Sequence, residues 1–427
     1  MNDGDLGVQQ VRLLFLTAEP WPTFRADVAV LFGRWLPRYG IQSELVTTAA
    51  LPAGAAATPW GGGAARLRTL RGGAARRRLA TWLHGAAALL AARRAHCDAI
   101  QVRDMPVLAA FGLVMARLVG LPFFYWMSYP IPEGQIALAR QRGLSEGLMK
   151  FLYPWVSGRA GRVLLYRFVL RGADHVFVQS QRMADDLAGR GIAASRLTPV
   201  PMAVDFEAVE VSSIEPAADE RLRGRRVLVY LGTLERTRRI ERLFEMMALL
   251  RTRVPDARLV LVGDAEEAAD RLWLEGQARQ NEVGEAIIWT GWQPAREAWR
   301  WLRCAELGLS PIPRGPLLDV GSPTKVPEYL MFGLPVVCND NPDQAALIAA
   351  CGAGRCVPYT AQAFADAVVE LLALAPGERA ALGAAGRALV GRERNYRGIA
   401  RQLAQRYRLV LGQRGSASAR RKEPPAR

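Results

Sequence analysis

Residues 321–337 read GSPTKVPEYLMFGLPVV: small residues in a turn, a single lysine, a glutamate near the start of a short helix, and a Gly-x-Pro step into a buried strand. A chain that enters a helix through Ser322 and Thr324 presents unpaired backbone N–H groups and the positive end of the helix dipole to an anion. Lys325 adds a mobile cation, and Glu328 can accept hydrogen bonds from a ribose diol. This order predicts a nucleotide-diphosphate site; the alternative is an ordinary capped helix with a structural lysine.

The sequence on either side of this stretch alternates between short apolar runs and helical patterns, which is typical of parallel βαβ units. In the first half, apolar runs predict strands at residues 11–17, 43–47, 98–102, 122–127 and 174–180. In the second half, further runs predict strands at residues 226–232, 258–263, 286–291, 307–311 and 334–339. The predicted fold class is α/β, with two Rossmann-like domains that face each other across a cleft.

The length of 427 residues exceeds a single typical core, so two domains are expected. An acidic, Pro-containing stretch separates them, and an Ala-, Gly- and Arg-rich stretch with weak periodicity interrupts the first. We predict an N-terminal domain at 1–205 with a flexible insertion at 51–78, a linker at 206–224, a C-terminal domain at 225–395, a closing helix at 396–411 and a disordered basic tail at 412–427.

The net charge of +16 is concentrated in the first half of the chain. Through Asp205 there are 24 basic and 13 acidic residues, against 32 and 27 in the remainder. Such a one-sided field suits a surface that meets anionic lipid or a phosphate-bearing substrate, and coding bias toward arginine is the alternative source of the charge. Nucleic acid is not an expected partner, because no helix-turn-helix, zinc-finger or aromatic RNP pattern accompanies the charge.

Several common classes of protein find no support in the sequence. No HExxH, Walker or GxGxxG motif occurs, which argues against a zinc peptidase, a P-loop kinase and an ordinary dinucleotide dehydrogenase. The stretch 105–127 is broken by Arg117 and Pro122, and its apolar arm at 105–116 is too short for a membrane span. No secretory signal opens the chain. Five scattered cysteines fit a reduced compartment, and Cys351 and Cys356 lack the further ligands of a metal site. We expect a cytoplasmic protein, with peripheral attachment at the inner face of the membrane as an option.

Several segments, in order and spacing, together resemble glycosyltransferase family 4, whose fold is GT-B. They are ADHVFVQSQRMADDL (173–187), PVPMAVD (199–205), YLGTLERTRRIERL (230–243), LVLVGD (259–264), IIWTGW (287–292), the stretch at 321–337 and GAGRCV (352–357). The resemblance covers nearly the whole chain. It implies that the second domain binds a nucleotide sugar, that the first binds the acceptor, and that transfer retains the anomeric configuration without a required metal ion or other cofactor.

The resemblance also assigns donor-side residues. It implies catalytic roles for Arg238, Lys325 and Glu328, with the two cations on the leaving diphosphate and Glu328 on the nucleotide ribose. It implies donor binding by the glycine turn at Gly232 and by residues near the phosphates, namely Thr233, Arg236, Ser322, Thr324 and Glu328. The sequence resembles the subfamily that carries a Ser-Pro-x-Lys segment followed by Glu-Tyr.

The sequence departs from the family pattern at several positions, among them Val320 and the stretch 126–129. Val320, next to Asp319, occupies the position where the first motif glutamate usually contacts the transferred sugar. The first-domain histidine that often follows the fourth strand is replaced by the stretch 126–129. The identity of the sugar is therefore not read from this motif.

Charged residues near predicted strand ends are the acceptor-side candidates. They are Arg25 and Asp27, Arg103 and Asp104, and Glu133 as an acid or base. The alternatives are an Arg–Asp pair that braces a loop and a solvated loop glutamate. We interpret the histidines at 84, 96 and 175 as structural.

These patterns lead to one functional hypothesis and two rivals. The hypothesis is a retaining glycosyltransferase that uses a nucleotide-sugar donor and a saccharide or lipid-linked acceptor, in envelope polysaccharide or glycoconjugate synthesis. One rival is a sugar-nucleotide 2-epimerase of the same fold, which needs acid/base carboxylates and histidines that this chain offers sparsely. The other is a non-catalytic glycosyltransferase-like binding protein, which Val320 brings into consideration.

Overall fold

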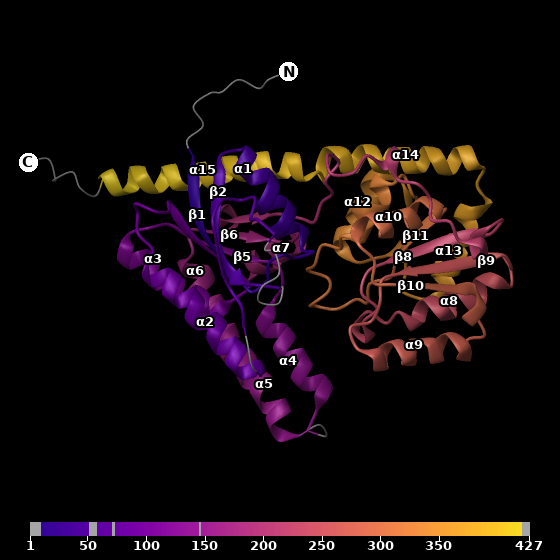
Figure 1. Cartoon of the computed structure of the whole chain (residues 1–427), viewed down its shortest axis with the longest axis horizontal. Coiled ribbons are helices and arrows are strands. Elements are labelled where there is room, and N and C mark those ends of the chain that lie inside the picture. The colour runs from indigo at the N-terminus through magenta and orange to yellow at the C-terminus, as the bar shows by residue number, and fades with distance from the viewer. Residues whose placement is uncertain (1–9, 51–57, 71–72, 145–146, 421–427) are drawn as a thin grey trace, which may run out of the picture. The chain divides into compact units, whose positions relative to one another are not determined.

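The computed structural model of the chain describes residues 10–50, 58–70, 73–144 and 147–420 and divides into two compact units (Figure 1). Unit 1 contains the described residues up to Pro201 together with those from Tyr396 onward, and unit 2 contains Met202–Asn395. Each unit is built on one parallel sheet flanked by helices, which confirms the predicted pair of Rossmann-like domains.

The sheet of unit 1 has the strand order β3-β2-β1-β4-β5-β6-β7, and every neighbouring pair is parallel. Its strands are β1 (Val11–Thr17), β2 (Ile41–Thr48), β3 (Ala65–Arg68), β4 (Ala99–Arg103), β5 (Phe123–Met127), β6 (His175–Val178) and β7 (Leu197–Pro199). Strands β4, β5 and β6 are buried on both faces, which explains their continuous apolar sequences.

The sheet of unit 2 has the strand order β10-β9-β8-β11-β12-β13. Its strands are β8 (Arg226–Leu231), β9 (Ala257–Val262), β10 (Ile287–Gly291), β11 (Leu307–Ser310), β12 (Val336–Asn339) and β13 (Gly354–Val357). In each unit the order reverses between the first strand and the fourth, so that a crevice opens beyond the carboxyl ends of β1 and β4 and of β8 and β11.

The helices of unit 1 include a long hairpin. Helices α4 and α5 run side by side and project from the sheet, with α2 alongside (Figure 1). The main helical elements of the unit are the π-helix η1 (Asp27–Trp35), α1 (Leu36–Arg38), α2 (Ala74–Leu90), α3 (Pro106–Val119), α4 (Ile131–Arg142), α5 (Leu148–Val163), the π-helix η2 (Leu164–Val169), α6 (Leu170–Gly172), α7 (Gln181–Gly189) and α15 (Tyr396–Arg420). None of the described helices has both the length and the apolar character to cross a bilayer.

The helices of unit 2 cover its sheet and enclose two apolar clusters, one on each face. The main ones are α8 (Glu241–Arg251), α9 (Ala268–Gln280), α10 (Ala295–Cys304), α11 (Lys325–Met331), α12 (Pro342–Cys351), α13 (Ala361–Ala373) and α14 (Pro376–Glu393), with a short 3₁₀ turn η6 (Arg236–Arg238) after β8.

All predicted strands are present, with ends that differ from the predictions by at most two residues. No apolar run predicts β3, β7 and β13, and each of these short strands lies at an edge of its sheet. An edge strand is covered less completely than a central one, so its sequence shows weaker apolar patterning.

The linker predicted at 206–224 is wrong, because this segment belongs to unit 2. Val209, Val211 and Ile214 are buried in one of the apolar clusters of that unit, against Val227 and Val229 of β8. Burying these side chains outweighs the polarity of the acidic residues between them.

The flexible insertion predicted at 51–78 is wrong over its described part; residues 51–57 and 71–72 lie outside the described residues. Strand β3 pairs in parallel with β2, and Trp60 is buried with its indole N–H donating to the carbonyl of Ser43 at 3.0 Å. Helix α2 begins at Ala74.

The boundary predicted between the closing helix and a disordered tail is also wrong. One helix, α15, extends from Tyr396 to Arg420 and belongs to unit 1; residues 421–427 lie outside the described part. The hydroxyl of Tyr407 donates to the side-chain oxygen of Gln101 on β4, and Arg414 forms an ion pair with Asp174 at 2.7 Å. These contacts extend past residue 412, which accounts for the greater length of the helix.

Candidate functional site

At the reversal of strand order in unit 2, two strand ends are joined by the tyrosine that follows the candidate glutamate. The hydroxyl of Tyr329 accepts a hydrogen bond from the backbone N–H of Leu231 at 2.8 Å and donates one to the carbonyl of Leu309 at 3.1 Å. It therefore joins the carboxyl ends of β8 and β11. Because Tyr329 lies on α11, the same contacts fix the helix that carries Lys325 and Glu328 at this crevice.

Lys325 is buried beneath the turn after β8. Its ammonium group donates to the hydroxyl of Tyr230 at 3.1 Å and lies 4.2 Å from the centre of that ring. Burial, followed by repulsion from Arg238, lowers the pKa of Lys325 well below its usual value, although Glu328 and Glu235 oppose the shift. A buried amine with a lowered pKa gains from a nearby anion, because the anion stabilises its charged form.

Glu328 is partly buried and lies one helical turn beyond Lys325. Within the described residues, its carboxylate has no hydrogen-bonding or ionic partner. Burial raises its pKa to about 7, and Lys325 acts in the opposite direction. An unpartnered carboxyl group at a crevice can take up hydrogen bonds from a ligand hydroxyl pair.

Replacing Glu328 by Gln is expected to change the pH dependence of folding stability. A carboxyl whose folded pKa is about 7, against an ordinary value of 4.5, stabilises the fold most at low pH and loses this contribution as the pH rises toward 7. The shift sets an upper limit of about 3 kcal/mol, which partial exposure reduces to about 1–2 kcal/mol. The stability of Glu328→Gln relative to the wild type should therefore increase from pH 5 to pH 8 in urea unfolding.

The matched control is Glu220→Gln, at an exposed site paired with Arg223. Its stability relative to the wild type should stay constant over the same pH interval. A constant difference for Glu328→Gln as well would contradict the raised pKa of Glu328.

Gly232 brings the backbone close to the lysine. Its φ of +132° favours glycine, and a Cβ there would lie 3.7 Å from the ammonium nitrogen of Lys325. Gly263, at the end of β9, also has a positive φ, and a Cβ there would come within 2.3 Å of the carbonyl oxygen of Gly232. Two glycines that are neighbours in space thus leave the end of β8 without side chains. The carbonyl of Thr233 accepts a hydrogen bond from the hydroxyl of Tyr230 at 3.3 Å.

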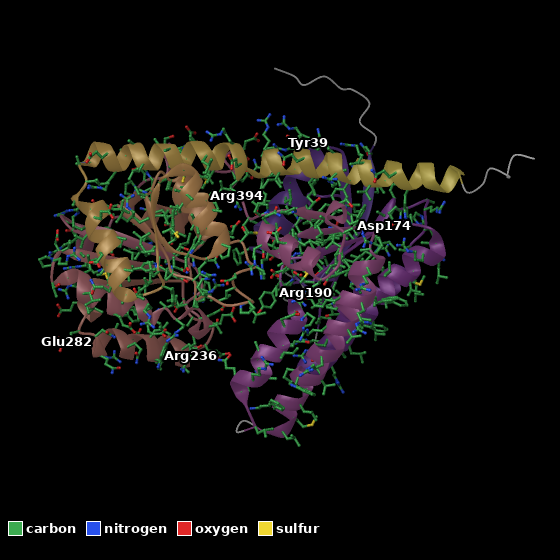
Figure 2. All side chains as sticks on the ribbon, turned by 180° about the vertical axis from the view of Figure 1, so that it is seen from behind. Tyr39, Asp174, Arg190, Arg236, Glu282 and Arg394 are labelled. Carbon is green, nitrogen blue, oxygen red and sulfur yellow. The ribbon has the colours of Figure 1, made fainter. Side chains whose placement is uncertain are left out.

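The two candidate arginines of the η6 turn have different surroundings. Arg238 is partly buried, pairs with Glu235 at 3.6 Å, and is close enough to Lys325 to lower its pKa. Arg236, which is labelled in Figure 2, forms an ion pair with Asp270 at 2.5 Å. Its guanidinium lies 4.7 Å from the centre of the Trp273 ring. Arg238 thus lies near Lys325, whereas Arg236 is held by side chains of α9.

The hydroxyl of Ser322 is occupied by a structural network, and the predicted use of Ser322 as a phosphate ligand stays a prediction. It accepts a hydrogen bond from the backbone N–H of Met202 at 2.9 Å and donates to Asp343 at 2.7 Å. Arg394 completes the network with a bond to Asp343 at 2.7 Å. These contacts tie together the first and last residues of unit 2. Thr324 is exposed at the start of α11, so its predicted donor contact stays a prediction.

The position that departs from the family motif lies in the interior. Val320 is buried, and the neighbouring Asp319 pairs with Arg314 at 2.8 Å. Asp319 is therefore held by another residue of the same unit.

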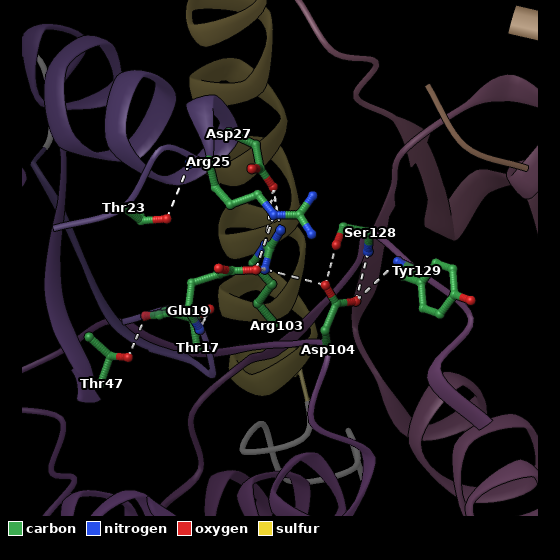
Figure 3. Close-up of polar contacts among 10 residues, drawn as sticks. All are labelled: Thr17, Glu19, Thr23, Arg25, Asp27, Thr47, Arg103, Asp104, Ser128 and Tyr129. Carbon is green, nitrogen blue, oxygen red and sulfur yellow. Dashed lines mark hydrogen bonds and ion pairs between the residues drawn. The ribbon is translucent and has the colours of Figure 1, made fainter. Parts of the chain in front are cut away.

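Four of the acceptor-side candidates meet at the reversal of strand order in unit 1 (Figure 3). Arg103, at the end of β4, is 2% exposed and donates to Asp27 at 2.9 and 3.1 Å. Its other contacts are Glu19 at 3.5 Å and Asp104 at 3.4 Å. Burial lowers the pKa of Arg103, but the three carboxylates together raise it above the usual value.

In this cluster Asp27 has a different partner from the one in the Arg–Asp pair that the sequence offers as an alternative. Asp27 pairs with Arg103 rather than with Arg25, and Arg25 pairs with Glu19 at 3.2 Å. Asp104 has a φ of +54° and accepts hydrogen bonds from the backbone N–H and hydroxyl of Ser128. Burial raises the pKa of Asp104, and Arg103 acts against that shift. Arg103 and Asp27 are therefore interior braces, and the half-exposed Arg25 is the member that faces solvent.

Glu133 is not part of this cluster. It lies at the start of α4, 3.4 Å from Arg162 and 4.0 Å from Arg190. His175 is buried, which lowers its pKa to about 4, and contacts Thr198 at 2.8 Å, in agreement with a structural role.

Sequence reasoning missed Tyr230, Tyr329 and Glu19. The two tyrosines stand next to the motif residues, in YLG and PEYL, but only their contacts with Lys325 and with two strand ends reveal their positions in the site. No motif signals Glu19, whose partners Arg25 and Arg103 are distant in sequence from each other.

Two family models match the chain, one in each half. The model described as "Glycosyl transferase 4-like domain" matches residues 26–203, and the model described as "Glycosyl transferases group 1" matches residues 225–374. No curated protein sequence matches the chain.

Several solved structures share the fold along nearly the whole chain. Sucrose-phosphate synthase from Thermosynechococcus elongatus is 18% identical, with 95% of this chain and 100% of that chain covered and a TM-score of 0.68. HepE of Anabaena, in complex with UDP, is 16% identical, with coverages of 93% and 99% and a TM-score of 0.64. A UDP-forming α,α-trehalose-phosphate synthase from Burkholderia vietnamiensis is 14% identical, with coverages of 94% and 100% and a TM-score of 0.67. At these identities the likeness shows the shared GT-B fold.

Proposed function

The chain belongs to the GT-B glycosyltransferases, and we propose that it transfers a sugar from a nucleoside-diphosphate donor to a saccharide or lipid-linked acceptor with retention of configuration. One observation carries the proposal. At the strand-order reversal of unit 2, a buried lysine with a lowered pKa and a carboxyl group without a protein partner lie on one helix, beside a glycine turn. A nucleoside diphosphate offers what each lacks, an anion for Lys325 and a ribose diol for Glu328.

Uridine diphosphate is the first nucleotide to test. HepE of Anabaena has been solved with UDP and with UDP-glucose, and it shares the fold over 93% of this chain. Its sequence identity of 16% supports the fold rather than the choice of base, so GDP-, dTDP- and ADP-sugars belong in the same panel.

In the proposed reaction, the acceptor hydroxyl attacks the anomeric carbon on the face from which the diphosphate leaves. The new carbon–oxygen bond forms as the bond to the phosphate oxygen breaks, and the hydroxyl proton passes to that departing oxygen. Lys325 and Arg238 stabilise the negative charge that develops on the diphosphate. Because these two side chains supply the positive charge, the proposed mechanism requires no metal ion.

The acceptor belongs to unit 1 in this proposal. The first half of the chain carries most of the excess positive charge, which suits an acceptor or a membrane surface that bears phosphate. We propose a peripheral position at the inner face of the membrane, in envelope polysaccharide or glycoconjugate synthesis.

Replacing Glu328 by Ala is expected to weaken UDP binding by about 10- to 100-fold, because hydrogen bonds between a carboxylate and two ribose hydroxyls are charge-assisted. Isothermal titration calorimetry with UDP and UDP-sugars measures the loss. Glu220→Ala, which removes an exposed carboxylate of the same unit, should bind as the wild type does.

The same panel tests the rival functions. A binding protein without donor chemistry takes up none of the sugar nucleotides, and an epimerase converts the donor without any acceptor. Unchanged affinity of Glu328→Ala for every donor that the wild type turns over would show that the nucleotide lies elsewhere.

A further inference from the structure

Unit 1 contains a hollow of about 330 Å³ that is lined mainly by arginines. The arginines lie on three consecutive helical segments and at the end of a fourth element. They are Arg159 and Arg162 on α5, Arg167 on η2, Arg171 on α6 and Arg190 after α7. None of the donor-side candidates belongs to these elements, so the hollow is a separate feature of the molecule.

A π-helical turn aligns the arginines. The backbone N–H of Leu170 donates to the carbonyl of Leu165, five residues earlier, as expected for η2. A π-type hydrogen bond joins residues five positions apart, which is the spacing between Arg162 and Arg167. An uninterrupted α-helix would turn Arg167 away from Arg162 by more than a quarter of a turn, since it has about 3.6 residues per turn. The π-turn therefore places both guanidinium groups on the wall of the hollow.

The positive charge of the hollow is only partly compensated. Glu133 lies near two of the arginines, at 3.4 Å from Arg162 and 4.0 Å from Arg190. Arg190, which is labelled in Figure 2, also lies over Tyr166, with its guanidinium carbon 4.5 Å from the ring centre. Within the described residues, the guanidinium groups of Arg167 and Arg171 have no ionic or hydrogen-bonding partner. Among the described residues, five arginines thus line the hollow, and Glu133 pairs with two of them.

We propose that this hollow binds a phosphate or diphosphate group. A guanidinium group binds phosphate oxygens through two parallel hydrogen bonds. An anion bound among several guanidinium groups also reduces the repulsion between them. A volume of about 330 Å³ lies at the lower end of the range of ligand sites. It accommodates a diphosphate together with part of the sugar or lipid attached to it. The ligand is thus a phosphorylated sugar or a lipid phosphate.

The surroundings favour a lipid as the carrier of the phosphate. Val163 and Phe168 are exposed apolar side chains next to the arginines in the sequence, and Leu148, Met149 and Tyr153 are exposed toward the start of α5. Apolar side chains next to cationic ones are the composition with which helices enter the boundary between lipid headgroups and acyl chains. The proposal deepens the acceptor side of the proposed function, and its phosphate chemistry is testable without the donor.

The test compares two double variants with equal loss of charge. Arg167→Gln/Arg171→Gln changes the hollow, and Arg279→Gln/Arg392→Gln removes two exposed arginines of unit 2. One probe is inorganic pyrophosphate, titrated by calorimetry with saturating UDP present to occupy the donor site. The other is flotation with phosphatidylcholine vesicles that contain phosphatidic acid. We expect the hollow variant to lose at least tenfold in affinity for one or both probes, because charge-assisted bonds are involved, while the control retains wild-type binding.

The pattern of loss identifies the source of the phosphate. Loss of pyrophosphate binding indicates a soluble phosphate ligand, and loss confined to vesicles indicates a lipid. Arg167→Lys/Arg171→Lys, which keeps the charge without the guanidinium fork, should recover only part of the affinity. Equal losses in the hollow variant and the control, or no binding of either probe by the wild type, would overturn the proposal. UDP affinity, measured separately in the same variants, reports on the donor site alone.

Discussion

Lys325→Ala is expected to lower kcat by about 100-fold or more, the largest effect on activity that the structure predicts. Removing one preorganised group that stabilises developing charge costs about 2.7–4 kcal/mol of barrier in comparable sites. Lys325 fits this role because its ammonium group is already buried and held by the hydroxyl of Tyr230 at 3.1 Å. Gly232 places no side chain over this group, and a Cβ there would lie 3.7 Å from the ammonium nitrogen.

The measurement is the initial rate of sugar transfer. The donor is one that the panel shows to be active, and donor and acceptor are both at saturating concentration. Tyr230→Phe is the matched control, because it removes the hydroxyl that holds Lys325 and keeps the cation. Its kcat should fall much less than that of Lys325→Ala. Melting curves of both variants establish that the fold is intact. Wild-type kcat in Lys325→Ala with every active donor would remove Lys325 from the reaction.

Arg103→Met is expected to lower the free energy of unfolding by about 3–5 kcal/mol, the largest effect on stability. Breaking a buried ion pair by removal of one partner leaves an uncompensated charge in the interior, and this is the usual magnitude. Asp27 is 4% exposed, and one of its oxygens has no hydrogen-bonding partner among the described residues even with Arg103 in place. Asp104 and Glu19 lose the same cation.

Two controls separate burial of charge from loss of an ordinary contact. Arg12→Ala removes an ion pair with Asp98 whose partners are 48% and 38% exposed, so its cost should stay below about 1 kcal/mol. Arg103→Met with Asp27→Leu replaces the buried pair by apolar groups and should regain much of the lost stability. Urea unfolding measures all three. A cost for Arg103→Met no larger than that for Arg12→Ala would contradict its role as an interior brace.

The donor half of the site was largely predictable because its residues are close together in sequence. Lys325, Glu328 and the turn at Gly232 follow the helix start and the glycine step that their motifs contain. The strands could be predicted for a similar reason, since a central parallel strand needs a continuous apolar run. The edge strands β3, β7 and β13 lack that constraint, and none was predicted.

The first-unit cluster could not be predicted in the same way. The sequence places Arg25 two residues from Asp27, and proximity suggested that they form a pair. In the folded chain Asp27 pairs with Arg103, which is 76 positions away, because the carboxyl ends of β1 and β4 are adjacent at the reversal of strand order. Likewise, the valines between 206 and 214 contact β8 instead of forming a linker.

The sequence by itself determined that this protein has two Rossmann-like units, and it located the lysine and the glutamate of the candidate donor site. Both follow from local constraints, namely apolar runs for buried strands and a short ordered motif at a helix start. Only the tertiary structure decided what those groups do to one another: Lys325 contacts Tyr230 rather than Glu328, and Ser322 is held by Met202 and Asp343. Burial and long-range pairing set the pKa of each group and its availability to a ligand, and these depend on neighbours that come from distant parts of the chain.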